Sequence, residues 1–84
     1  VANVPGARSI CDSILAPMPG VVTFQVNAAL LGGVAVVSDD AVRDAMRVAL
    51  AEFGLVVEPG GAAALAAALV GKVPVAGRCV AVIL

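Results

Sequence analysis

The sequence contains no histidine, no tryptophan and no tyrosine, and only two of its 84 residues are cysteine. Without histidine, and with Cys11 and Cys79 far apart, the ligand spacing of a zinc site is missing. Two cysteines without a framework pattern are typical of a reducing compartment. We therefore expect a cytoplasmic protein in which both thiols are small buried hydrophobes.

Charged residues are also scarce, at 13% of the chain, and the net charge is −1. This balance offers no basic surface for nucleic acid. Hydrophobic residues make up 62% of the chain, above the roughly 45–50% of ordinary globular proteins. A chain this short buries only a modest core. We therefore expect a protein partner, either the remainder of the same protein or another copy of this chain.

A membrane span does not fit the pattern. Glu58 and Pro59 precede the alanine-rich run and Lys72 and Pro74 follow it, so the run falls short of the about 18 apolar residues that a spanning helix needs. The chain starts without methionine and ends within an apolar run, residues 79–84. From both ends we expect a portion of a larger protein.

The clearest helix signal begins at Ser38, which can cap a helix, and ends at Gly54. Two aspartates follow the serine, where the helix dipole favours negative charge. The apolar positions of this segment form one stripe that we expect to face the core: Val42, Ala45, Met46, Ala49 and Phe53.

Two further helices are expected. One covers residues 22–31, with Thr23 as a candidate N-cap and two glycines after it. The other runs from Gly60 to Val70, behind a proline at the first helical position. Because this second segment is apolar on every side, we expect it to be buried on every side. Pro5-Gly6 marks a turn in an irregular start, residues 1–8.

Short apolar runs, rich in β-branched residues, separate these helices. Residues 34–37 and 79–84 are expected to be buried strands, and residues 55–57 a short strand or an extended segment. The alternating order predicts an α/β fold, as part of a mostly parallel sheet flanked by helices. A parallel sheet needs cover on both faces, so we expect the rest of it to lie outside these residues.

Three polar features stand out in apolar surroundings. Glu58 lies before the alanine-rich helix, where the dipole favours an acid. However, glutamate is not a preferred N-cap, and a buried unpaired charge is costly, so structural and functional roles stay open. Asp12 is better explained as a turn or capping residue. Gly60 and Gly61 match no phosphate-loop pattern, and close packing of a helix start explains them better.

Four segments in the same order resemble one enzyme family. Residues 58–62, Glu-Pro-Gly-Gly-Ala, are similar to the Glu-Pro-x-Gly-Ala core of threonine/serine dehydratases. These are pyridoxal-phosphate enzymes of fold type II, the tryptophan synthase beta-like family, which also includes serine racemases. Residues 9–13 resemble its Thr-Ile-Ala-Asp-Gly, and residues 19–24 its Pro-Gly-x-x-Thr-Phe. Residues 36–47 resemble its Val-Ser-Asp-Glu-Glu-Ile…Ala-Met-Arg.

The resemblance implies that residues 1–84 are the C-terminal portion of a catalytic domain, a fragment of the large domain of such an enzyme. The family's Schiff-base lysine and glycine-rich phosphate loop lie upstream, and Lys72 is in the wrong context to be that lysine. We therefore expect no catalytic residue here and a fragment that is inactive alone. The whole enzyme would convert a hydroxy amino acid to a 2-oxo acid and ammonia.

The resemblance also implies cofactor-binding positions. Glu58 would lie at the edge of pyridoxal 5'-phosphate, and the backbone of Asp12 and Ser13 near its phenolic oxygen. The family commonly has Asp-Gly where this chain has Asp-Ser, which restricts the backbone. After Leu84 the family has a turn that meets the pyridine nitrogen. The substrate, racemase activity and oligomeric state stay open.

A second interpretation also stays open. The chain could be a stand-alone small α/β interaction or regulatory module that self-associates through its apolar helix.

Overall fold

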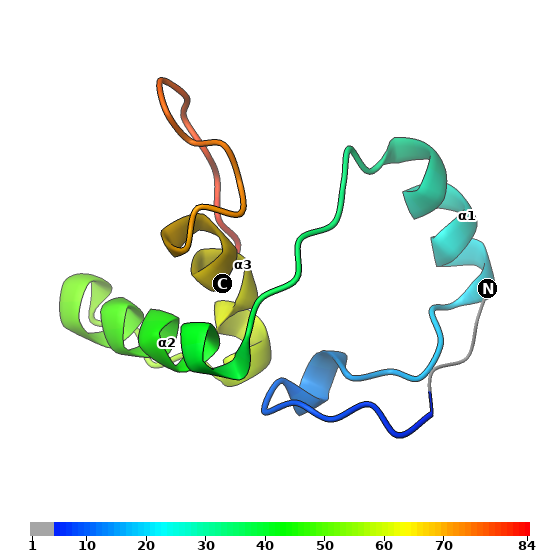
Figure 1. The fold of residues 1–84 in the computed structure, drawn as a ribbon, viewed down its shortest axis with the longest axis horizontal. Coiled ribbons are helices and arrows are strands. Elements are labelled where there is room, and N and C mark those ends of the chain that lie inside the picture. The colour runs from blue at the N-terminus through cyan, green and yellow to red at the C-terminus, as the bar shows by residue number, and fades with distance from the viewer. Residues whose placement is uncertain (1–4) are drawn as a thin grey trace.

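The computed structural model describes residues 5–84, and all the regular structure in this range is helical. A short 3-10 helix, η1 (Asp12–Ile14), is followed by three α-helices: α1 (Val21–Leu30), α2 (Asp39–Phe53) and α3 (Pro59–Leu69). Helix α2 packs on α3, and η1 contacts the same helix. Helix α1 stands apart from this group, across an opening in the chain trace (Figure 1).

The predicted parallel sheet, and with it the α/β assignment, is wrong for this structure. Residues 5–84 contain no strand, and residues 34–37, 55–57 and 79–84 run as irregular chain. A strand requires backbone hydrogen bonds to a neighbouring strand. The β-branched pattern gives only a local preference, and Val34, Val56 and Ile83 are 88%, 90% and 86% exposed. These apolar segments therefore form no backbone hydrogen bonds of a sheet with one another.

Helix α2 forms as predicted. The Ser38 hydroxyl accepts a hydrogen bond from the backbone amide of Ala41 at 3.1 Å. Gly54 ends the helix in the left-handed region, with φ 66°, which glycine adopts without strain. The expected stripe holds for its first part, because Val42, Ala45 and Ala49 are buried. Phe53 is 59% exposed and lies outside the core.

Helix α3 supplies the other half of the core. It begins at Pro59, and its buried residues are Ala62, Leu65, Ala66 and Ala67. The expectation of burial on every side is wrong, because Leu69 is 52% exposed. The buried face is mostly alanine, which lets the backbones of α2 and α3 approach closely. Cys11 is buried against this core as expected, whereas Cys79 is exposed.

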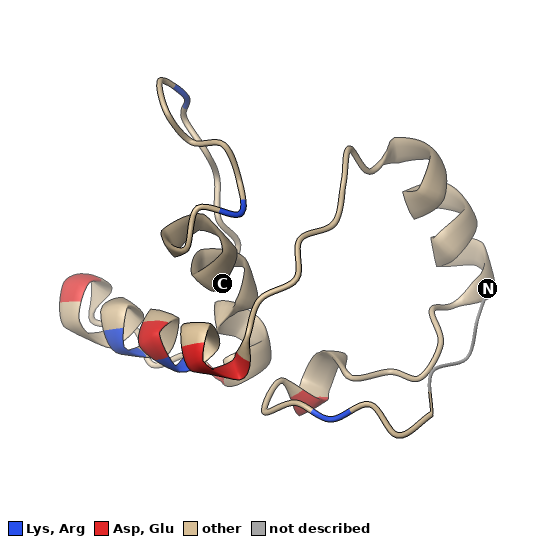
Figure 2. Cartoon of the chain, viewed as in Figure 1, with Lys and Arg blue, Asp and Glu red and all other residues tan. Residues whose placement is uncertain are grey.

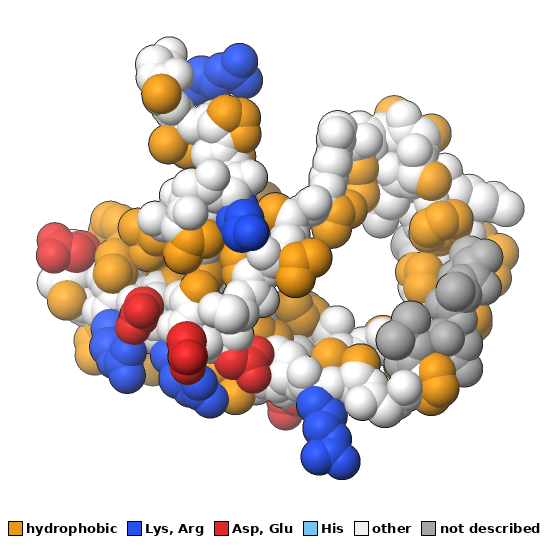
Figure 3. Space-filling model, viewed as in Figure 1, with side chains coloured by type: hydrophobic (Ala, Val, Ile, Leu, Met, Phe, Trp, Pro, Cys, Tyr) orange, Lys and Arg blue, Asp and Glu red, His pale blue; other side chains and the backbone are white. Residues whose placement is uncertain are grey.

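Helix α1 begins one residue before the predicted start, and Gly20 rather than Thr23 is its N-cap. The Thr23 hydroxyl donates to the Gly20 carbonyl at 3.1 Å. None of its ten residues is buried, and Figure 3 shows orange side chains on its surface. Its apolar sequence therefore forms a helix without a packing partner within residues 5–84.

The expected irregular start falls partly outside the described residues, which begin at Pro5. The turn at Pro5-Gly6 is present, with φ 79° at Gly6. Within residues 5–84, the helices are all too short or too polar to cross a bilayer.

Candidate functional site

The charged side chains of this chain gather mainly on α2 (Figure 2). Arg43 pairs with Asp40 at 2.7 Å and Arg47 with Asp44 at 2.6 Å, each one helical turn apart. All four side chains are well exposed, so each pair contributes little to stability. This face is a solvated helix surface. Two other carboxylates bond to distant segments: Asp39, the first residue of α2, and Glu58.

One such carboxylate fastens the chain before η1 to the start of α2. Asp39 accepts hydrogen bonds from the Ser9 hydroxyl at 2.7 Å and from the Ile10 backbone amide at 3.3 Å. The Ser9 hydroxyl in turn accepts from the backbone amide of Cys11 at 3.0 Å. This network orients the segment that leads into η1, where Asp12 and Ser13 lie.

A second carboxylate, Glu58, joins η1 to the start of α3. Glu58 is the N-cap residue of α3, but its side chain accepts no hydrogen bond from that helix. It accepts one from the Ser13 hydroxyl instead, at 3.0 Å and across 45 residues of sequence. Both residues are exposed. Glu58 is therefore not the buried charge that its apolar neighbours suggested, yet it does have a polar partner.

Gly60 makes room for this contact. A Cβ built on Gly60 would lie 2.1 Å from Ser13 Oγ, far inside van der Waals contact. The same Cβ would lie 3.5 Å from Glu58 Oε1. The interpretation of Gly60 as a close-packing glycine is thus confirmed, and Ser13 is the residue packed against it. At Gly61 a Cβ would meet the Leu84 carbonyl carbon at 3.7 Å and Glu58 Cγ at 3.8 Å, which are ordinary contacts.

The other predicted residue, Asp12, opens η1, and its backbone carbonyl accepts a hydrogen bond from the Leu15 amide at 3.2 Å. This is the turn role favoured for it from the sequence. Three segments far apart in sequence therefore meet here: η1, the first residues of α3 with their N-cap Glu58, and Leu84. Two of the three predicted residues, Ser13 and Glu58, touch directly.

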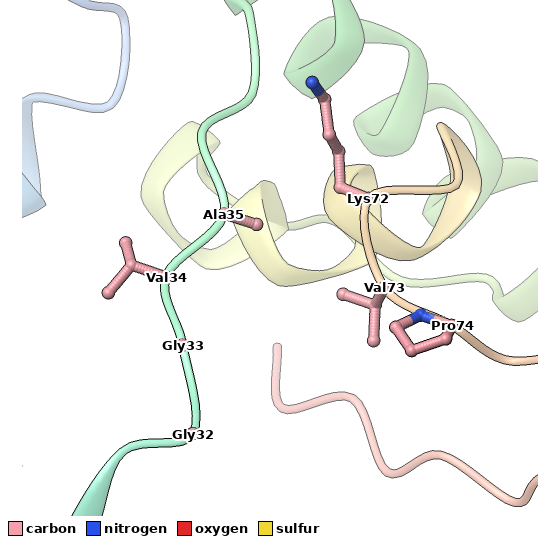
Figure 4. A pocket seen from close by; sticks show the side chains of 7 residues that line it. All are labelled: Gly32, Gly33, Val34, Ala35, Lys72, Val73 and Pro74. Carbon is pink, nitrogen blue, oxygen red and sulfur yellow. The ribbon is translucent and has the colours of Figure 1, made fainter.

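A different part of the surface carries the only lysine of the sequence. Lys72 lines a pocket of about 380 Å³ between the turn after α3 and the irregular segment before α2. Figure 4 shows its side chain running away from Gly32 and Gly33, and the rest of the lining is backbone and apolar side chains. This pocket offers a single charge and no second polar side chain.

The cofactor that the resemblance implies has polar atoms around a flat ring. The start of α3 offers a carboxylate and a hydroxyl, and Gly60 makes room for that hydroxyl. These two polar groups fit one polar edge of the cofactor. Lys72 follows the opposite end of α3, and the 11 residues of that helix span roughly 16 Å. Ser13 and Glu58 therefore fit the edge of the cofactor. The lysine that would bind the cofactor covalently would come from another part of the protein.

Sequence reasoning missed the bond between Ser13 and Glu58. The signal was present as two departures from expectation: a serine where the family commonly has glycine, and a glutamate at a position that prefers serine, threonine, aspartate or asparagine. The sequence does not show that the two residues form a pair, because they lie 45 positions apart.

The comparisons with known proteins bear on all 84 residues. The family model described as pyridoxal-phosphate dependent enzyme matches residues 1–84. No curated protein and no solved structure matches the chain. Since the family model spans the whole chain, the protein belongs to the family of pyridoxal-phosphate-dependent enzymes, and pyridoxal 5'-phosphate is the family's cofactor.

Proposed function

We propose that this chain is the C-terminal portion of the catalytic domain of a threonine/serine dehydratase, a cytoplasmic ammonia-lyase. The observation that carries the proposal is the hydrogen bond from Ser13 to Glu58. It joins two segments that each resemble that family and that lie far apart in sequence. A chance resemblance in either segment would give no reason for the two to meet.

The roles of the individual residues are those that the family resemblance implies. Glu58 would accept a hydrogen bond at the edge of the cofactor ring through Oε2, the oxygen that Ser13 does not use. The backbone of Asp12 and Ser13 would lie near the phenolic oxygen, held by the turn of η1. All three would order the polar surroundings of the ring. None of them attacks the substrate.

The cofactor, when bound, supplies an electron sink for the negative charge that develops on the α-carbon of the amino acid. Glu58 would keep its carboxylate beside the ring because Ser13 fixes its direction. Gly60, which has no side chain, leaves the room that the Ser13 hydroxyl needs to reach Glu58. In the overall reaction, each hydroxy amino acid is converted to one 2-oxo acid and one ammonia, with no other product.

The partner in this proposal is the remainder of the same enzyme. Large apolar side chains are exposed on every helix and on the segments between them, among them Val22, Leu30, Val36 and Leu50. So much exposed apolar surface marks an interaction face. The lysine and the phosphate loop would come from that remainder, and the 84 residues alone would be inactive.

The test uses the full-length protein, purified with its cofactor. It is incubated with L-threonine or L-serine, and 2-oxo acid and ammonia are measured together. Equal amounts of both products support the proposal. A cofactor-loaded protein that makes D-serine from L-serine, and no 2-oxo acid, would be a racemase and would refute it.

The stand-alone alternative predicts a different outcome. A module that self-associates would fold cooperatively as the isolated 84 residues and would need no further chain. Under our proposal the isolated chain aggregates or melts without cooperativity, and it releases no ammonia from threonine.

A further inference from the structure

The Ser13 side chain fills a space that the start of α3 leaves open for it. Its Oγ lies where a Gly60 side chain would be, since a Cβ there would come within 2.1 Å. The next neighbours of that Cβ, Glu58 Oε1 and Ile14 Cγ2, would be at 3.5 and 3.6 Å, which is ordinary contact. Ser13 alone therefore excludes a side chain at Gly60.

The same hydroxyl sets the direction of the Glu58 carboxylate. An acid at the start of a helix is drawn to the free amides of the first turn. Glu58 makes no hydrogen bond to those amides and bonds to Ser13 instead. If Ser13 turned away to admit a side chain at Gly60, it would break this bond. Ser13, Glu58 and Gly60 thus depend on one another.

We infer that Ser13 is a positioning residue: its hydroxyl holds Glu58 toward the cofactor's edge, and Gly60 is required to admit it. The inference rests on the proposed cofactor site and adds a role for the Ser13 side chain, beyond the backbone contact that the family resemblance implies. Ser13 acts on the cofactor only through Glu58.

The first measurement follows the cofactor in the full-length holoenzyme. Ser13→Ala lowers kcat by about tenfold, the size expected from losing one hydrogen bond to a charged group, while KM changes much less. The absorption spectrum of the bound cofactor changes as well, because the carboxylate beside the ring is no longer fixed. Ser13→Thr keeps the hydroxyl and restores both kcat and spectrum.

A matched serine control lies at the start of α2. The Ser38 hydroxyl accepts a hydrogen bond from the Ala41 amide at 3.1 Å and caps that helix. Ser38→Ala lowers thermal stability and leaves the cofactor spectrum unchanged. A similar spectral change in both variants would mean that Ser13 has a merely structural role, and would overturn the inference.

The second measurement needs no activity. In the cofactor-free full-length protein, Gly60→Ala lowers the melting temperature by about 2 °C or more, because it displaces the Ser13 hydroxyl. In the Ser13→Ala background the obstacle is gone, and alanine is the better helix former. There Gly60→Ala leaves the melting temperature unchanged or raises it.

The outcomes separate the two proposals. If Gly60→Ala lowers the melting temperature equally in both backgrounds, the three residues are not coupled and the inference fails. If Ser13→Ala leaves kcat and spectrum unchanged in an active dehydratase, the inference fails while the proposed function stands. If the wild-type protein binds the cofactor but makes no 2-oxo acid, the dehydratase proposal fails, and the spectrum and the Gly60 coupling still decide the role of Ser13.

Discussion

Helix α2 begins with a serine that accepts a hydrogen bond from its own first turn, whereas α3 begins with a glutamate that does not. At α2, the Ser38 hydroxyl accepts from the Ala41 amide, and the two aspartates after it lie where the helix dipole favours negative charge. At α3, the Glu58 side chain is engaged by Ser13, which comes from a different element. The two helices pack on each other in one core, so their starts share the same support.

Stability alone explains the residues at the start of α2, but it does not explain the glutamate at the start of α3. A serine or aspartate in place of Glu58 would cap α3 and contribute about 1 kcal/mol. The chain forgoes that contribution and holds a carboxylate away from the helix amides. We read α2 as the structural half of the core and the start of α3 as the half that carries the site.

The largest expected effect tests that reading through activity. In the full-length holoenzyme, Glu58→Ala lowers kcat/KM by roughly 100-fold, because a misplaced site component costs about this much. Glu52→Ala is the matched control, since Glu52 is an exposed glutamate at the far end of α2. Steady-state kinetics with threonine or serine measure both. Equal losses in the two variants would remove the distinction between the helices.

The next effect concerns the core that both starts share. Ala66 is fully buried between α2 and α3, so Ala66→Leu forces extra volume into a packed contact and costs about 1–3 kcal/mol. Chemical denaturation of the full-length protein measures the loss. Arg47→Leu on the solvated face of α2 is the control and changes stability little, because its ion pair with Asp44 is exposed. If this variant were the more harmful one, another surface would cover that face of α2.

A smaller effect is confined to the start of α2. Ser38→Ala removes the acceptor for the Ala41 amide and costs about 1 kcal/mol. Hydrogen exchange then speeds up at the first amides of α2 and stays unchanged at those of α3. The cofactor spectrum is also unchanged. A spectral change in this variant would show that the start of α2 takes part in the site.

The elements that could be predicted are those whose signals are local. Ser38 and Gly54 mark the two ends of α2, on either side of its apolar stripe. Pro59 marks the first residue of α3. Thr23 failed as an N-cap because its hydroxyl bonds back to the Gly20 carbonyl inside the first turn. Threonine is a common N-cap residue, but here Thr23 lies inside the first turn and Gly20 is the N-cap.

What could not be predicted depends on long-range pairing. The apolar runs before and after the helices carried a strand signal, but a strand forms only where a partner strand offers its backbone groups. Glu58 and Asp12 could be singled out as acids in apolar surroundings. The partner of Glu58 could not, because the Ser13 hydroxyl comes from a turn whose position is set by tertiary contacts.

The smallest expected effect converts the start of α3 into the type found at α2. In the Ser13→Ala background, where the hydrogen bond to Glu58 is already lost, Glu58→Ser installs a preferred cap, worth about 1 kcal/mol, and loses a favourable charge near the helix dipole, worth about 0.5 kcal/mol. Thermal melts of the cofactor-free full-length protein should therefore show a slight gain in stability. The same variant loses activity, because the carboxylate is gone. A loss of stability instead would mean that Glu58 is kept for the helix, and the two helix starts would then differ only in how they are stabilised.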